Sequence, residues 1–201
     1  MVLTELQYPH IMSQYLKEIP PIFYSNETGA PIQRCLVCDS YLLDGAEYII
    51  EKAVVNYPTV GTRDLVWEFA LCMDCMEEIT SEYSEESQQK MSQYFIENMN
   101  MGHLRELKEA ENFDVNEWIS KCIVKGKAQS DCSQYQLCGH FVGELCVFDH
   151  TPFLVSDEAM DEVVQLISNK TLGSMNDFRD RFFPPPEDLS PLLRDKEFIL
   201  I

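Results

Sequence analysis

The chain has 201 residues, of which 45% are hydrophobic and 11% aromatic, enough to build a packed core in one domain or two small ones. Its 34 acidic residues outnumber 15 lysines and arginines, and the net charge of −19 disfavours nucleic acid as a partner because such a surface repels phosphate backbones. The sequence contains no apolar run of about 18 residues, and its first residues lack the basic start and apolar core of a signal peptide. These features predict an acidic cytoplasmic protein that does not enter a membrane.

Residues 1–34 are predicted to form a peripheral N-terminal arm. Apolar residues from Ile11 to Leu16 recur at helical spacing and indicate one short helix. Pro20 should end this helix, because proline cannot continue the backbone hydrogen-bond pattern. The apolar residues of the arm are expected to pack on the domain that follows.

Two Cys-x-x-Cys pairs mark the next unit. A two-residue spacer lets both thiolates of a pair reach the same ion, and four sulfurs supply the tetrahedral coordination of a structural zinc site. We therefore expect one structural Zn²⁺ per chain, with the ligands Cys35, Cys38, Cys72 and Cys75. This ligand set is closed and leaves no coordination position for water or substrate. A rubredoxin-like iron site is an alternative, although Asp39 and Met76 follow the pairs where that site usually carries glycine, and dithiol redox chemistry is another.

The unit that carries these cysteines spans residues 35–112. Residues 48–55 and 65–71 are rich in β-branched and aromatic side chains and predict an antiparallel hairpin. After the second cysteine pair, apolar residues up to Met99 follow a 3.6-residue period. This spacing predicts one long helix that ends at Gly102.

The order of knuckle, hairpin, second cysteine pair and helix resembles a treble-clef zinc finger over residues 33–100. The resemblance implies that Cys72 and Cys75 lie in the first turn of the helix, where the helix dipole and free N–H groups stabilise thiolates. Treble clefs serve many functions, so the resemblance implies an architecture and not an activity.

Residues 113–186 predict a second unit of a hairpin and helices. Residues 137–142 and 144–148 flank a glycine and indicate the hairpin. Ser156 should cap a helix, which residues 169–173 separate from a last one. The two units together predict an α+β fold: a treble-clef-like hairpin and helix, then a second β-rich unit with C-terminal helices.

The second unit shows a weak sequence similarity to the first. Residues 121–125 resemble residues 34–38, and each stretch precedes β-rich sequence and then a helix. This pattern suggests a duplicated unit whose second copy has lost its metal, because Leu154 and Asp157 stand near the later helix start in place of cysteines. Chance similarity between two short β-rich stretches is the alternative.

The C-terminal tail, residues 187–201, is charged and then apolar from Phe198 to Ile201. An exposed apolar end is unusual for a protein surface. We expect the tail to form an edge strand or to pack on the core, with a docking peptide as the alternative.

The remaining cysteines form a looser set with two histidines. Its members are Cys122, Cys132, Cys138, His140, Cys146 and His150. Their spacing is irregular, so both a second metal site and scattered buried thiols are open interpretations. Cys138 and His140 are two residues apart on a predicted strand, which places them on one face as a conceivable nucleophile and base.

The sequence carries no phosphate-binding glycine loop and no recognisable catalytic motif. The closed metal site and the acidic surface favour a zinc-stabilised scaffold or adaptor that binds a partner protein. The first alternative is an enzyme with a pocket between the two halves that uses Cys138, His140 or His150. A nucleic-acid-binding zinc finger is the least favoured alternative, because of the net charge.

Overall fold

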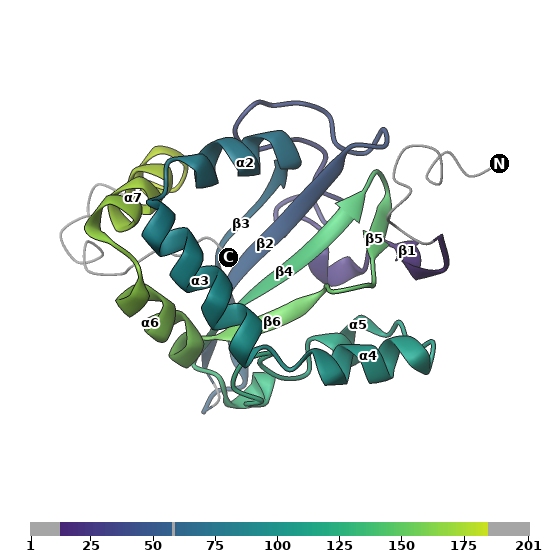
Figure 1. Ribbon diagram of the computed structural model, residues 1–201. Helices are drawn as coiled ribbons and strands as arrows, with labels where there is room; N and C mark the ends of the chain where they lie inside the picture. Colours follow the sequence, from purple (N-terminus) through teal and green to yellow (C-terminus); the bar gives the residue numbers. More distant parts are fainter. Residues whose placement is uncertain (1–12, 58, 185–201) are drawn as a thin grey trace.

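The computed structural model describes residues 13–57 and 59–184, and it has the expected α+β architecture, with helices packed on an antiparallel sheet (Figure 1). The strands are β1 (Leu16–Glu18), β2 (Glu47–Tyr57), β3 (Thr62–Cys72), β4 (Gln134–Val142), β5 (Leu145–Val147) and β6 (Phe153–Ser156). The helices are α2 (Met73–Ser81), α3 (Glu85–Asn98), α4 (Met101–Glu109), α5 (Val115–Trp118), α6 (Asp157–Leu166) and α7 (Asn169–Phe182). Short 3₁₀ turns are η1 (Ser13–Tyr15), η2 (Pro21–Phe23) and η3 (Gln129–Asp131). Within the described residues, no helix is both long enough and apolar enough to cross a membrane.

The described strands form a six-stranded sheet whose centre is the antiparallel pair β2 and β4. Strand β3 pairs with the other edge of β2, which confirms the hairpin predicted at 48–55 and 65–71. Strands β5 and β6 pair with different parts of the second edge of β4, and β1 continues the sheet beyond β5. The units predicted at 35–112 and 113–186 therefore contribute neighbouring strands to one sheet, and the boundary between them does not separate two sheets.

The single long helix predicted up to Met99 is wrong, because the chain forms two helices there, α2 and α3. The side chain of Ser84 accepts a hydrogen bond from the N–H of Ser87 and caps α3. The apolar spacing therefore continues although the helix is interrupted at this point. Gly102 lies inside α4 and does not end the preceding helix.

The break predicted at 169–173 is also wrong, because these residues form the first turns of α7. The helix begins one residue after Ser168, whose side chain accepts a hydrogen bond from the N–H of Thr171. The serine cap therefore outweighs the helix-weakening effect of Gly173.

The N-terminal arm differs from its prediction as well. Leu16 lies in β1 and pairs with Val147, so it belongs to the sheet and not to a helix. Ser13–Tyr15 form only the 3₁₀ turn η1, whereas residues 11 and 12 of the predicted helix lie outside the described part, as does the tail predicted at 187–201.

Aromatic side chains pack on both faces of the sheet. On the face covered by helices, Phe69 of β3 meets Phe178 of α7 with ring centroids 5.7 Å apart. On the opposite face, Phe141 of β4 stacks on Tyr48 of β2 at 5.3 Å and meets Phe23 of η2 at 5.2 Å. These residues are buried, and they fix the sheet between the helical layer and the N-terminal segment.

Candidate metal centre

The first two cysteines of the cluster lie in a tight turn before β2, here called the first knuckle (residues 34–41). The N–H of Asp39 donates to the carbonyl of Cys35 at 3.0 Å, and Asp39 has a left-handed φ of 59°. This conformation reverses the chain and brings the side chain of Cys38 back toward that of Cys35. The N–H of Leu36 donates to the carbonyl of Ala70 at 2.9 Å, which joins the knuckle to the end of β3.

The other two cysteines lie where β3 meets α2. Cys72 is the N-cap residue of α2, and Cys75 lies in its first turn, as the treble-clef resemblance implied. The first N–H groups of a helix have no partner within the helix, and its dipole is positive at this end. Both effects favour a thiolate at this position.

The four sulfur atoms fit the dimensions of a tetrahedral metal site. All four lie within 4.8 Å of one another, and the Sγ atoms of Cys38 and Cys72 are 3.7 Å apart. Metal–sulfur bonds of about 2.3 Å in a tetrahedron place the sulfurs about 3.8 Å apart, whereas a disulfide needs about 2.05 Å. All four cysteines are free thiols, so the arrangement can hold one metal ion.

The thiols differ in their tendency to ionise. A hydrogen bond with Ser40, whose Oγ is 3.0 Å from Sγ, lowers the pKa of Cys38 to about 6. Burial raises the pKa of Cys72 and, more strongly, that of Cys75. Cys38 therefore becomes a thiolate before Cys72 and Cys75, and a bound cation would favour the thiolate form of those two.

The structure does not bring the looser cysteine and histidine set together. The group formed by the first four cysteines is the one set of possible metal ligands found among the described residues. Cys132 follows η3, Cys146 is buried in β5, and His150 is an exposed residue beside Asp149. These positions lie on separate elements, and we correspondingly find no second metal cluster in the described part of the chain.

Cys138 and His140 both lie on β4, but their surroundings differ. Cys138 is buried, and its pKa is raised well above the usual value, first by burial and then by the charge of Glu51. The Nε2 atom of His140 lies 2.7 Å from a carboxylate oxygen of Glu47. A catalytic thiol needs a lowered pKa and a base within hydrogen-bond reach, so the environment of Cys138 opposes its use as a nucleophile.

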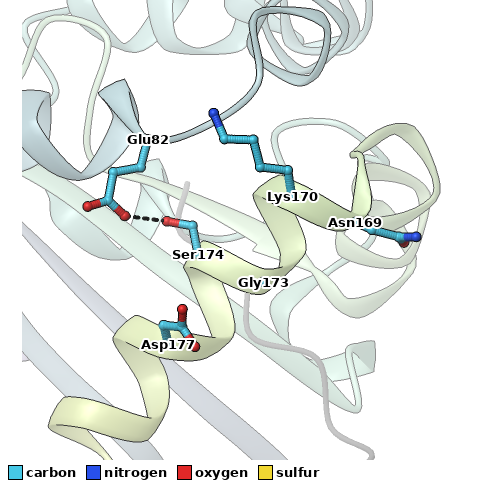
Figure 2. A pocket seen from close by; sticks show the side chains of 6 residues that line it. All are labelled: Glu82, Asn169, Lys170, Gly173, Ser174 and Asp177. Atoms are coloured by element: carbon cyan, nitrogen blue, oxygen red, sulfur yellow. Dashed lines mark hydrogen bonds between the residues drawn. The ribbon is translucent and has the colours of Figure 1, made fainter.

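A surface groove adjoins the first knuckle between α2 and α7. It encloses about 290 Å³ and is lined by Val37, Glu78, Ile79, Glu82, Ser174, Asp177, Phe178, Arg181 and Phe182. A second hollow of about 490 Å³ continues along α7 toward Lys170 and shares Glu82, Ser174 and Asp177 with the first. Figure 2 shows Glu82 reaching across to Ser174, whose hydroxyl donates to its carboxylate at 2.8 Å.

Sequence reasoning did not identify this groove. Its walls come from segments about 90 residues apart, and neither α2 nor α7 carries a motif that marks a binding surface. The apolar spacing of α7 could only indicate that one face is covered. Comparison of the chain with protein-family models, curated proteins and solved structures finds no match.

Proposed function

We propose that this protein is a treble-clef scaffold, stabilised by one zinc ion, that binds a partner protein through the groove between α2 and α7. The observation that carries the proposal is the closed set of four thiols at the junction of hairpin and helix. Such a site holds structure together and leaves no coordination position for a substrate. Zinc is the metal of choice because it accepts four thiolates in a tetrahedron and has no redox chemistry.

The groove supports the binding part of the proposal because it lies against the metal site. Val37, between the two knuckle cysteines, forms part of its wall, so the metal that orders the knuckle would also order the groove. Half-buried Val37, Ile79 and Phe182 offer apolar contact, while Glu78 and Asp177 add negative charge at the rim. A segment with bulky apolar side chains and a lysine or arginine is complementary to this surface.

Metal analysis of the purified 201-residue chain tests the first part. We expect one zinc per chain, lost on Cys35→Ser or Cys72→Ser together with much of the stability, since structural zinc contributes directly to folding. Cys132→Ser is the matched control, because this cysteine lies outside the cluster, and it should keep the zinc. A well-folded wild-type protein without zinc would refute the proposal, and bound iron would favour the rubredoxin-like alternative.

Peptide selection tests the second part. We would select a random 12-residue phage library on the immobilised metal-loaded chain and then measure the affinity of the best synthetic peptide by fluorescence anisotropy. We expect enriched lysine or arginine beside bulky apolar residues. The double variant Glu78→Gln/Asp177→Asn should weaken binding by about 2- to 30-fold, from two exposed charge pairs at about 0.2–1 kcal/mol each.

The control for that experiment is Ile96→Lys, which changes a residue that is 79% exposed on α3, outside the groove. It should leave the peptide affinity unchanged. Binding that ignores the groove variant but responds to the control would place the partner on α3 and overturn the assignment of the groove.

A further inference from the structure

Two turns of the chain, one in each half, share the same hydrogen-bond pattern. In each, the N–H of a cysteine donates to the carbonyl five residues later, at 3.0 Å for Cys35 and 2.8 Å for Cys122. The carbonyl of the same cysteine accepts from the N–H four residues later, again at 3.0 and 2.8 Å. That fourth residue has a left-handed φ in both turns, 59° at Asp39 and 67° at Gly126. Residues 121–128 therefore form a second knuckle.

Both knuckles are joined to the sheet in the same way. The N–H of Leu36 donates to the carbonyl of Ala70 at 2.9 Å, and the N–H of Ile123 donates to that of Leu154 at 2.8 Å. Each accepting carbonyl lies two residues before the N-cap of a helix, which is α2 in the first case and α6 in the second. Both halves thus run from a knuckle through a long central strand to a strand that ends at a helix N-cap, and the second half has the short strand β5 in addition.

The central strands relate the two halves by a pseudo-two-fold rotation. In the ladder between β2 and β4, Tyr48 pairs with Phe141, and Val54 pairs with Tyr135. Tyr48 and Tyr135 each follow the cysteine of their knuckle by 13 positions. A two-fold axis through the middle of this ladder would exchange the two pairs, so each position of β2 has a counterpart on β4.

The helical layer repeats this symmetry in its side chains. Ser84 caps α3 and Ser168 caps α7, and their hydroxyl oxygens are 2.9 Å apart. The N–H of Ser84 donates to Thr171 at 3.0 Å, and the N–H of Ser168 donates to Ser87 at 2.8 Å. Each cap therefore binds the first turn of the other helix in a reciprocal manner, as a two-fold axis between them requires.

This correspondence assigns a counterpart in the second half to each cysteine of the metal site. The counterparts of Cys35, Cys38, Cys72 and Cys75 are, in order, Cys122, Lys125, Ser156 and Ala159. The sequence similarity pointed to Leu154 and Asp157 at the helix start, but both are out of register with the cysteines, because the N-cap of α6 is Ser156.

Polar contacts join the second knuckle to α6, at the place where the first half has its four thiols. The Sγ of Cys122 accepts a hydrogen bond from the hydroxyl of Ser156 at 3.2 Å and from the N–H of Lys125 at 3.3 Å. The ammonium of Lys125 donates to Glu162 at 2.5 Å, and the hydroxyl of Tyr94 donates to the same carboxylate at 2.7 Å. The methyl group of Ala159 is fully buried at the position of the fourth ligand.

We propose that residues 121–182 are a second copy of the metal-binding unit and that the second knuckle is a dormant metal site. Its backbone retains the geometry that orients four thiolates toward one divalent cation of the zinc class. Three side chains, at positions 125, 156 and 159, keep it from binding metal. This inference rests on the proposed zinc site of the first half for the ligand chemistry, while the correspondence of the halves stands on the hydrogen bonds and strand register alone.

The test is the triple variant Lys125→Cys/Ser156→Cys/Ala159→Cys of the 201-residue chain, compared with wild type. Zinc per chain would be measured by mass spectrometry, and cobalt(II) titration would report tetrathiolate coordination by its visible absorption. We expect two metal ions per variant chain against one for wild type. Adding Cys122→Ser, the matched control, should abolish four-sulfur coordination at the second site and leave the first unchanged.

The outcomes separate this inference from the proposed function. Wild type without metal refutes the proposed function, whereas one metal in both wild type and a folded triple variant refutes the dormant site. Should the triple variant not fold, the double variant Lys125→Cys/Ser156→Cys leaves the buried Ala159 intact and still offers three thiols. It should bind one additional cobalt ion, more weakly, and a folded double variant with no additional cobalt overturns the inference.

Discussion

The reciprocal caps of α3 and α7 make a prediction about how strongly the two halves are joined. The change is Ser87→Ala, at a side chain that is fully buried. Its hydroxyl oxygen accepts from the N–H of Ser168 at 2.8 Å and from the hydroxyl of Ser84 at 2.8 Å. Alanine removes this acceptor and leaves both donors without this partner.

The magnitude follows from the cost of an unpaired buried donor, about 1–3 kcal/mol. We expect Ser87→Ala to lower the free energy of unfolding by that amount. Thr171→Val, an equal-sized change at the position related by the two-fold axis, should cost a similar amount, because it removes the acceptor for the N–H of Ser84 at 3.0 Å. The double variant should cost less than the sum by at least about 0.5 kcal/mol, since both residues contact the same serine pair.

Urea unfolding of the zinc-loaded chain, followed by circular dichroism, measures these free energies. The control is Ser92→Ala, an exposed residue on the same helix, which should leave stability unchanged or raise it by up to about 0.5 kcal/mol because alanine favours helix. If Ser87→Ala and Thr171→Val both fall within about 0.5 kcal/mol of wild type, the caps do not join the halves and the reasoning fails.

Two further predictions concern packing and thiol chemistry. Gly139→Ala should destabilise the protein by about 1–3 kcal/mol in the same assay, because a Cβ atom there would lie 2.7 Å from the ring of Phe141 and 3.0 Å from that of Phe23. Gly173→Ala in α7 is the comparison: its Cβ atom would meet no atom within 4 Å, and it should stabilise the protein by up to about 1 kcal/mol. Equal effects of the two changes would contradict the packing of β4. Burial raises the pKa of Cys132 to about 11, so at pH 8.5 it should react with iodoacetamide about 100-fold more slowly than free cysteine, and the rate should rise with pH up to that pKa. Peptide mapping by mass spectrometry measures the rate, and fast labelling of Cys132 in folded protein would show that the residue is exposed.

The cluster of four cysteines could be predicted from sequence because the positions of its members are encoded locally. Each pair needs only a tight turn or a helix start, and the residues around Cys35 and Cys72 supply these within a few positions. The hairpin between the pairs was equally readable, since its β-branched runs flank a proline- and glycine-containing loop. Local chemistry of this kind determines an element without reference to the remainder of the chain.

Features that depend on distant contacts could not be predicted in the same way. The apolar period runs through Ser84 without interruption, and the helix break depends on its cap and on the partner cap at Ser168. The pairing of β2 with β4 joins residues that are 79 to 95 positions apart, from Val55 with Gln134 to Glu47 with Val142, and nothing in either strand specifies the other. The groove between α2 and α7 depends on the tertiary packing of two helices that are distant in sequence.

The correspondence of the halves also accounts for the charge of Glu78 in the groove between α2 and α7. In the second half, Glu162 is held by the ammonium of Lys125 and the hydroxyl of Tyr94. Its counterpart in the first half is Glu78, which lines the groove and takes part in no ion pair of the described residues. Cys38 stands where the second half has Lys125, so the first half has no lysine at the position that pairs with the glutamate.

A partner that brings a lysine or arginine to Glu78 would therefore reproduce there the ion pair that Lys125 and Glu162 form in the second half. The proposed metal site and the groove are thus linked, because a cysteine at position 38 in place of a lysine leaves Glu78 without an ion-pair partner among the described residues. Glu78→Gln should accordingly weaken a basic peptide in the groove, whereas Glu162→Gln should leave peptide affinity unchanged, since Lys125 already occupies that carboxylate. Equal loss of affinity in both variants would mean that the peptide responds to net charge and not to the groove.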